Sequence, residues 1–199
     1  MTESQLFSPQ DKNFIILKAA KEIFSQKGFH NTTISQVAKA AGVASGTIYD
    51  YFENKEALFF SIASERCEAF DKELTIHLSG LKCSFDKIRK YIWFYLYFFQ
   101  KDPIYADLLL LNMRVNPRFS KSEAYAWVKK STREIIEMVQ EGQSDGMFRD
   151  DIDAYSIRHL ILGSLEHVTT RWLLKGKSFD MLAESEKISN LIIEAIKRR

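Results

Sequence analysis

Residues 32–60 have the sequence TTISQVAKAAGVASGTIYDYFENKEALFF, and this stretch decides the fold. Thr33 and Gln36 match a capping box, in which the threonine side chain accepts from a backbone N–H and the glutamine side chain reaches back. A short helix is expected to follow and to end at Gly42, which can adopt the positive φ of a sharp turn. A second short helix is expected over residues 45–52. Two short helices joined in this way predict a helix-turn-helix, whose second helix can lie in the major groove of DNA.

This predicted two-helix unit has an inner and an outer side. On the inner side, apolar side chains are expected to pack together: Val37, Ala38, Val43, Ile48 and Phe52. The outer side of the second helix carries Ser45, Gly46, Thr47, Tyr49 and Tyr51. Small and hydroxylated side chains can approach base edges and phosphates. The alternative is a plain three-helix packing unit with a tyrosine-rich surface, which has no need of Gly46-Thr47 and two tyrosines facing solvent.

The flanking sequence predicts one helix before this unit and another after it. Residues 8–27 are expected to be helical, with Ser8 as the N-cap. Asn54 is expected to cap a long fourth helix. We therefore divide the chain into a helix-turn-helix domain, residues 8–54, and a linking helix with a ligand-binding and dimerisation domain, residues 55–199.

The larger part of the chain also shows only helical patterns. Residues 91–99 are apolar or aromatic on every face, which predicts a helix that is buried all round. A capping box is expected at Ser120 and Glu123, before one long helix whose apolar stripe continues to Val139. Two amphipathic helices follow the longest loop, residues 142–153. The chain is predicted to be all-α, with about nine helices.

The composition leaves the class of partner open. Lys and Arg number 28 against 26 Asp and Glu, a net charge of +2, so evidence for nucleic-acid binding must come from a site. Cys67 and Cys83 form no CxxC motif, and two such thiols indicate neither a disulfide framework nor a zinc cage. The longest apolar run, residues 91–99, is shorter than the roughly 20 residues that span a bilayer. We expect a cytoplasmic protein without a membrane contact, a metal or a cofactor.

Residues 33–58 resemble the signature of the TetR/AcrR family of transcriptional regulators, and the resemblance covers about residues 12–60. It implies a fold of about nine helices, a homodimer formed largely by the last two helices, and a repressor that a ligand releases from DNA. In such a dimer, two recognition helices about 34 Å apart match successive major grooves of a near-palindromic operator. The remainder of the chain resembles the family in its length and all-helical pattern.

The resemblance also implies roles for individual residues. It implies base contacts or close approach for Ser45, Gly46 and Thr47, phosphate or base contacts for Tyr49 and Tyr51, and phosphate anchoring for Thr32, Thr33 and Lys55. We also expect electrostatic support from Lys39 and Lys55. No arginine precedes Arg66, so the bidentate contact of arginine with guanine is absent from the motif. Asp50 adds an acidic group to the recognition helix. We expect hydroxyl contacts, apolar contacts and DNA shape to determine specificity.

The second half of the chain is expected to bind a small hydrophobic effector. The aromatic helix over residues 91–99 has more apolar surface than one core contact needs, and an aromatic cavity, a protein partner or plain packing would each cover it. Arg114 and Arg118 offer cationic groups to an anionic ligand, although surface salt bridges explain them equally well. The residues expected at the ligand site are Tyr91, Phe94, Tyr95, Phe98, Met113, Arg114, Phe119, Trp127, Glu166, His167 and Thr170.

Three short stretches resemble the fatty-acid-responsive members of the same family: residues 113–119, Glu166-His167 and Arg171-Trp172. This resemblance implies an apolar chain among the aromatic side chains. It also implies a carboxylate or a coenzyme A group near the arginines, which makes acyl-CoA a candidate effector.

The penultimate helix carries small residues at Gly163 and Ser164, which let another helix approach closely. Together with the apolar stripe of the last helix, they predict a four-helix dimer bundle with two helices from each protomer. Burial of both stripes within one chain is the alternative. His159, Glu166 and His167 share a broad helical face, but their spacing is not the i, i+3 or i, i+4 spacing usual for metal ligands on one helix, so we predict no metal site.

Two other classes of function remain as alternatives. An enzyme has little support, because the sequence shows no nucleophile elbow, Gly-rich phosphate loop, zinc signature or paired-cysteine redox motif. A helical interaction module without DNA binding would use the aromatic surface to bind a protein, and it would expose a large apolar patch.

Overall fold

The computed structural model describes residues 9–198, and the regular elements of this part of the chain are helices, so the all-α prediction is confirmed. The α-helices are α1 (Pro9–Asn31), α2 (Ile34–Ala41), α3 (Ser45–Tyr49), α4 (Lys55–Leu78), α5 (Ser84–Lys101), α6 (Pro103–Asp107), α7 (Glu123–Ser131), α8 (Arg133–Ser144), α9 (Ala154–Leu174) and α10 (Glu184–Ile196). A π-helix, η2 (Leu108–Met113), continues α6, and a short 3-10 helix, η3 (Phe119–Lys121), precedes α7.

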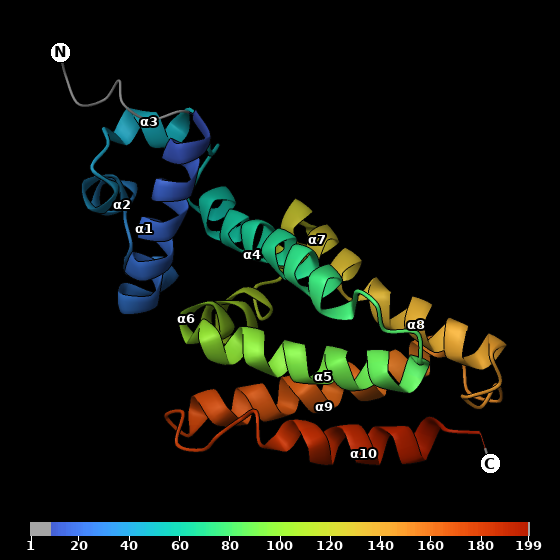
Figure 1. The fold of residues 1–199 in the computed structure, drawn as a ribbon. Helices are drawn as coiled ribbons and strands as arrows, with labels where there is room; N and C mark the ends of the chain where they lie inside the picture. Colours follow the sequence, from blue (N-terminus) through green and yellow to red (C-terminus); the bar gives the residue numbers. More distant parts are fainter. Residues whose placement is uncertain (1–8, 199) are drawn as a thin grey trace.

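The helices form a small head and a larger body. Figure 1 shows α1, α2 and α3 grouped at one end of the molecule, with α4 leading from this head along the body. Within the body, α4 packs against α7, and α5 packs against α8, α9 and α10. None of the helices within the described range is long and apolar enough to cross a membrane.

The turn between α2 and α3 forms as the sequence predicts. The backbone N–H of Gln36 donates to the Thr33 hydroxyl at 3.3 Å, and the backbone N–H of Thr33 donates to the Gln36 side chain at 3.1 Å. Gly42 follows α2 with a φ of 69°, a left-handed conformation that glycine adopts without strain. The predicted inner side is packed: Val37, Ala38, Ile48 and Phe52 are buried, and Val43 is partly buried against them.

The bounds of α1 and α3 differ from the prediction. α1 continues to Asn31 across Gly28, which has the non-helical φ of 74° and ψ of 164°. α3 ends at Tyr49, and residues 50–51 form a turn. The expected cap Ser8 lies outside the described residues.

The start of α7 shows that the predicted capping box at Ser120 is wrong. η3 includes Ser120, whose hydroxyl donates to the Pro117 carbonyl at 3.1 Å. Ser122 caps the helix instead, because its hydroxyl accepts from the backbone N–H of Tyr125 at 3.3 Å. The expected single long helix is also divided at Thr132, whose φ of −93° and ψ of −4° separate α7 from α8.

The aromatic helix α5 is buried on all but one stripe. Within residues 91–99, only Trp93 and Tyr97 are partly exposed, and their rings stack with centroids 5.1 Å apart. The ammonium groups of Lys90 and Lys101 lie over these rings, at 4.8 Å from Trp93 and 5.6 Å from Tyr97. The prediction of burial all round is therefore wrong for this stripe, where lysine side chains cover the rings.

Two sets of polar contacts join the head and its connecting helix to the body. The Asp102 carboxylate, between α5 and α6, lies 2.8 Å from the Lys21 ammonium of α1 and 3.4 Å from Arg66 of α4. In the first turn of α4, the Glu56 carboxylate accepts from Asn116 at 3.3 Å and from Arg118 at 3.2 Å. The turn before η3 and the start of α6 are thus each tied to the elements that carry the head.

Candidate DNA-reading surface and effector cavity

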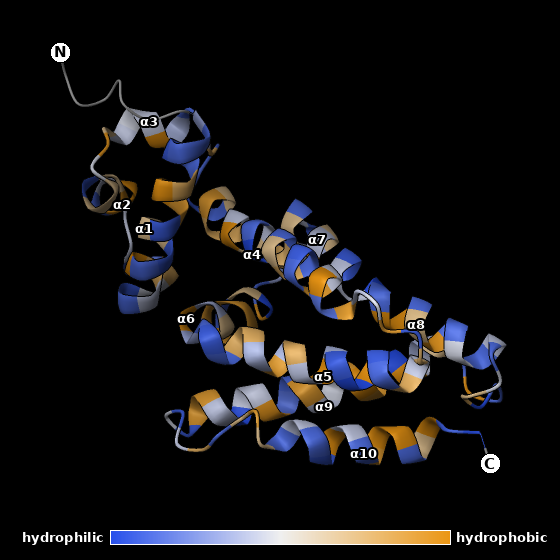
Figure 2. Cartoon of the chain, in the orientation of Figure 1, coloured by the Kyte–Doolittle hydropathy of each residue, from blue (hydrophilic) through white to orange (hydrophobic). Residues whose placement is uncertain are grey.

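The outer face of α3 presents small and hydroxylated side chains to solvent. Ser45, Gly46 and Tyr49 are exposed, with Tyr49 at 57%, while Thr47 and Tyr51 are half-buried. Figure 2 shows α3 mostly in the pale colours of intermediate hydropathy. A Cβ atom at Gly46 would meet no protein atom within 4 Å, so packing within the chain does not require this glycine. Because the side chains at Ser45 and Gly46 are small, the backbone of α3 can come close to another molecule at this face.

Thr33 and Lys39 lie on α2 or at its start, and both are exposed. Thr33 occupies the N-cap position, next to the free N–H groups of the first turn. Lys39 is in the last turn of the helix and extends into solvent. Both side chains are therefore accessible from solvent, and Asp50 is exposed at the end of α3.

Lys55 and Thr32, which were both predicted to contact phosphates, make hydrogen bonds within the chain. The Lys55 ammonium donates to the backbone carbonyls of Phe29 at 2.8 Å, Thr32 at 2.9 Å and His30 at 3.3 Å, and it lies 4.6 Å from the Phe29 ring centroid. Thr32 is 1% exposed, and its hydroxyl donates to the Gly28 carbonyl at 2.8 Å. An ammonium group has three donors, and all three are in use. Lys55 is therefore an internal clamp between α4 and the end of α1.

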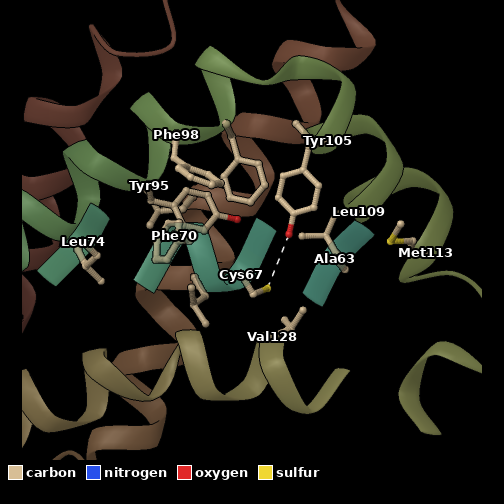
Figure 3. Packing of buried hydrophobic residues seen from close by; sticks show 14 of the residues in the cluster. Ala63, Cys67, Phe70, Leu74, Tyr95, Phe98, Tyr105, Leu109, Met113 and Val128 are labelled. Carbon is tan, nitrogen blue, oxygen red and sulfur yellow. Dashed lines mark hydrogen bonds between the residues drawn. The ribbon is translucent and has the colours of Figure 1, made fainter. Parts of the chain in front are cut away.

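An aromatic cavity lies inside the body between α4, α5, α6 and α7. Its walls are formed by Cys67, Phe70, Tyr91, Tyr95, Phe98, Phe99, Tyr105, Leu109, Arg114, Val128, Ser131 and Thr132. Figure 3 shows the Phe70 ring of α4 close to the rings of Tyr95 and Phe98 of α5, with Val128 of α7 below Cys67 in this view. The cavity volume is about 30 Å³, which is room for one or two water molecules. A larger ligand fits only if the walls move apart.

The cavity wall contains hydroxyl groups as well as rings. The Tyr105 hydroxyl pairs with the Cys67 thiol at 3.7 Å (Figure 3). Within the described part of the chain, the buried hydroxyls of Tyr91 and Tyr95 find no hydrogen-bond partner. Burial raises the pKa of both tyrosines far above the ordinary value, and the Glu166 carboxylate raises each pKa further. Both groups therefore remain protonated hydrogen-bond donors.

A basic groove of about 460 Å³ opens between α7, α9 and the turn that precedes η3. It is lined by Arg114, Phe119, Ser120, Tyr125, Val128, Lys129, Thr132, Arg158, His159, Leu162, Gly163 and Glu166. Within it, the guanidinium of Arg114 lies 2.5 Å from the Glu166 carboxylate. Arg114, Val128 and Thr132 line both the cavity and the groove, so the two spaces meet at these residues.

The predicted ligand residues divide into those that reach these spaces and those that do not. Tyr91, Tyr95, Phe98 and Arg114 line the cavity, and Phe119 and Glu166 line the groove. Phe94 and Met113 are buried in the core, but they are not part of either wall. Trp127, His167 and Thr170 line neither space; Trp127 lies beneath the Lys130 ammonium, and His167 is exposed on α9.

Sequence reasoning missed the cavity residues that other helices contribute. These are Cys67 and Phe70 of α4, Tyr105 and Leu109 after α5, and Val128, Ser131 and Thr132 of α7 and its end. It also missed the groove cations Lys129 and Arg158. The aromatic run on α5 is a signal for a cavity, but a run that is apolar on every face does not show which neighbouring helices it meets.

The histidine and acidic residues of α9 do not gather with others into a metal-binding group. Across residues 9–198, no three side chains of His, Cys, Asp or Glu come together in a way that could hold a metal ion. Glu166 instead pairs with Arg114, and His159 lies at the edge of the groove.

Comparison with known proteins gives matches along the whole of this architecture. Residues 16–62 match the family described as bacterial regulatory proteins, tetR family, and residues 64–195 match the YsiA-like protein, C-terminal region. The fatty acid metabolism regulator protein of Bacillus subtilis is 25% identical over 181 residues, which cover 91% of this chain and 93% of the relative.

Solved structures of related regulators have the same fold. The fatty acid degradation regulator FadR of Bacillus halodurans superposes with a TM-score of 0.85 at 26% identity, covering 95% of this chain and 97% of that one. FadR of Bacillus subtilis, solved in complex with stearoyl-CoA, superposes with a TM-score of 0.86 at 25% identity, covering 90% and 97%. These relatives are regulators rather than enzymes.

The head, the exposed face of α3 and the helical body define a DNA-binding transcriptional regulator of the helix-turn-helix class. The chain belongs to the TetR family of bacterial regulatory proteins and has a YsiA-like C-terminal region. Regulators of this family bind double-stranded operator DNA as dimers.

Proposed function

We propose that this protein is a repressor that an acyl-CoA releases from its operator. The observation that carries the proposal is the junction of an aromatic cavity with a basic groove at Arg114, Val128 and Thr132. Apolar walls suit an acyl chain, and the arginine and lysine side chains of the groove suit the phosphates of coenzyme A. The stearoyl-CoA complex of the related regulator from Bacillus subtilis supports this choice of ligand.

The small cavity volume supports a release mechanism that depends on expansion. A cavity of about 30 Å³ cannot hold an acyl chain unless α4, α5 and α7 move apart. The acyl-CoA therefore binds an expanded state better than the contracted one, and it shifts the population towards the expanded state by no more than this difference in affinity. In the dimer, a shift of α4 changes the spacing of the two heads.

The contacts between body and head give this movement a route. Arg114, Phe119 and Ser120 line the groove, and between them Asn116 and Arg118 hold Glu56 in the first turn of α4. The next residue back along α4, Lys55, is clamped to the end of α1. A ligand that displaces the turn before η3 therefore also displaces α4, the helix that carries the head.

We assign DNA contacts to the exposed residues of the head. Ser45 and Thr47 would contact bases, Gly46 would permit close approach, and Tyr49 and Tyr51 would contact phosphates or stack near bases. Thr33 and Lys39 would contact phosphates, while Thr32 and Lys55 support the head from within. We keep the division proposed from the sequence, with a helix-turn-helix domain at residues 8–54 and a linking helix with a ligand-binding and dimerisation domain at residues 55–199.

The last two helices offer a surface for the homodimer. Large apolar side chains are exposed on α9 and α10: Tyr155, Leu160, Leu174 and Leu191. Gly163 is also exposed on α9 and leaves room for a close approach of another helix. A second copy that covers these residues would complete a four-helix bundle. Since its operator lies in bacterial DNA, we place the protein in the cytoplasm.

Selection of bound sequences from random duplex DNA, followed by release experiments, tests the proposal. A near-palindrome with steep salt dependence is expected, because each protomer contacts phosphates in one half-site. Dodecanoyl-CoA should release this operator at concentrations at which coenzyme A alone and dodecanoate alone do not, since each fills only one of the two spaces. An operator complex that is indifferent to a series from octanoyl-CoA to octadecanoyl-CoA would refute the proposed effector.

A further inference from the structure

The hydroxyl groups of Tyr91 and Tyr95 lie buried in the cavity wall without a protein partner in the described residues. Tyr91 is 1% exposed and Tyr95 4%, so bulk water does not reach either group freely. A buried donor without a partner destabilises the folded chain. The same α5 places Trp93 and Tyr97 where solvent and lysines reach them. Two unsatisfied donors in one cavity therefore indicate a ligand with a hydrogen-bond acceptor.

Both tyrosines line the cavity together with Arg114, a residue that also lines the groove. Besides burial, the carboxylate of Glu166, which lines the groove, raises the pKa of both tyrosines. Arg114 lowers the pKa of Tyr95, and Arg158, another groove residue, lowers the pKa of Tyr91. Phe98, Phe99 and Leu109 supply apolar side chains to the same wall. We call the two hydroxyls the polar neck, because they belong to the wall that joins an apolar cavity to a basic groove at Arg114.

This neck matches one particular atom of the ligand. In an acyl-CoA, the thioester carbonyl lies between the apolar chain and the polar coenzyme A, and its oxygen accepts hydrogen bonds but does not donate them. Tyr91 and Tyr95 are donors at physiological pH, because a phenol with an ordinary pKa of about 10 is protonated there and burial raises the pKa further. A carboxylate would bring a negative charge into a largely apolar cavity, where desolvation opposes it. A neutral carbonyl oxygen satisfies the hydroxyls without that cost.

We propose that the hydroxyls of Tyr91 and Tyr95 bind the thioester carbonyl oxygen and so select acyl thioesters over other amphiphiles. This inference rests on the proposed acyl-CoA effector and adds a specificity-determining pair to that site. When the acyl chain enters and the walls move apart, the carbonyl oxygen accepts from the neck hydroxyls. The expanded state then gains hydrogen bonds that the contracted state lacks, which favours release of the operator.

A matched pair of ligands isolates the carbonyl. Dodecanoyl-CoA and S-dodecyl-CoA differ only in the replacement of the carbonyl by a methylene group. We expect the wild-type protein to bind dodecanoyl-CoA about tenfold more tightly in calorimetric titration, because a site built to hydrogen-bond a group discriminates against its absence. Tyr91→Phe and Tyr95→Phe should each reduce this ratio, and the double variant should bring it near one.

Tyr97→Phe is the matched control, because it removes a tyrosine hydroxyl from the partly exposed stripe of α5 and leaves the cavity intact. This variant should keep the tenfold ratio. Tyr91→Phe should also raise the melting temperature without ligand, since it removes an unsatisfied buried donor. The melting temperatures establish that each variant is folded.

The outcomes separate this inference from the proposed function. Equal binding of the two ligands by the wild-type protein would overturn the carbonyl contact and leave the acyl-CoA effector standing. A tenfold ratio that persists in the double variant would assign the discrimination to another group. If neither dodecanoyl-CoA nor S-dodecyl-CoA binds, the proposed effector fails and the inference fails with it.

Discussion

The guanidinium of Arg118 donates a hydrogen bond to the Glu56 carboxylate at 3.2 Å, across 62 positions of the sequence. Asn116 donates to the other oxygen of the same carboxylate at 3.3 Å. Glu56 lies in the first turn of α4, and its two partners lie on the turn that also carries groove residues. This contact joins the proposed effector site to the helix that carries the DNA-binding head.

Glu56→Ala should uncouple the effector from the operator. Arg118 is 79% exposed, so losing this ion pair should change the free energy of unfolding by less than about 1 kcal/mol. The variant should still bind operator and acyl-CoA separately. Its operator affinity should respond to acyl-CoA about fivefold less than that of the wild-type protein, in fluorescence anisotropy titrations. A full response would mean that the signal uses another route, such as the Lys21–Asp102 contact.

Lys55→Met should destabilise the head rather than remove a phosphate contact. It loses three hydrogen bonds to backbone carbonyls and the contact with the Phe29 ring. We expect the free energy of unfolding to fall by about 2–3 kcal/mol in urea titrations. Lys39→Ala is the matched control, because Lys39 is exposed: stability should be unchanged, and the salt dependence of operator binding should lose about one unit of slope per protomer. The opposite pattern would restore Lys55 as a phosphate anchor.

Tyr49→Ala should weaken operator binding at constant stability. The side chain is 57% exposed on α3 and has little packing to lose. We expect about a tenfold loss of operator affinity, which is about 1.4 kcal/mol, and an unchanged melting temperature. Phe14→Ala removes an aromatic ring that is 58% exposed on α1, outside the recognition surface, and should leave the operator affinity unchanged. Equal losses in both variants would argue against a specific role for Tyr49.

Glu65→Gln should make the protein more stable at neutral pH. Burial raises the pKa of Glu65, although Arg66 and Lys21 oppose the rise. A carboxyl with a raised folded-state pKa contributes stability in its protonated form, and this contribution is lost as the pH rises through the folded-state pKa. The gain in melting temperature of Glu65→Gln over the wild-type protein should therefore shrink in acid, where Glu65 is protonated and is as neutral as the glutamine that replaces it. Glu68→Gln should have the opposite sign at neutral pH, because the hydrogen bond from Lys72 lowers the pKa of Glu68.

The local features of the head could be predicted because they depend on neighbouring residues. The capping box of Thr33 and Gln36 and the left-handed Gly42 use side chains within one or two turns, and these features formed as expected. The clamp of Lys55 could not be predicted, because its acceptors lie 23 to 26 positions away and depend on how α1 meets α4.

The cavity shows the same limit for the body. The aromatic run on α5 indicated a buried helix, but which of its rings line a cavity depends on the neighbouring helices. Phe94 packs against Phe70 and His77 in the core, whereas Tyr95, one position on, lines the cavity. Ser122 rather than Ser120 caps α7, because η3 takes up the residues before it. Tertiary packing decides which of two neighbouring residues lines the cavity or caps the helix.

In the proposed mechanism, one acyl-CoA site and one operator site are coupled through two states of the dimer. The most direct test measures both affinities in both directions: operator affinity with and without saturating dodecanoyl-CoA, and dodecanoyl-CoA affinity with and without saturating operator. Thermodynamic linkage requires each ligand to weaken the affinity of the other by the same factor. We expect this factor to be about 5- to 150-fold. Binding of both ligands with no mutual effect would contradict this coupling, since the acyl-CoA would then bind without shifting the population between states that differ in operator affinity.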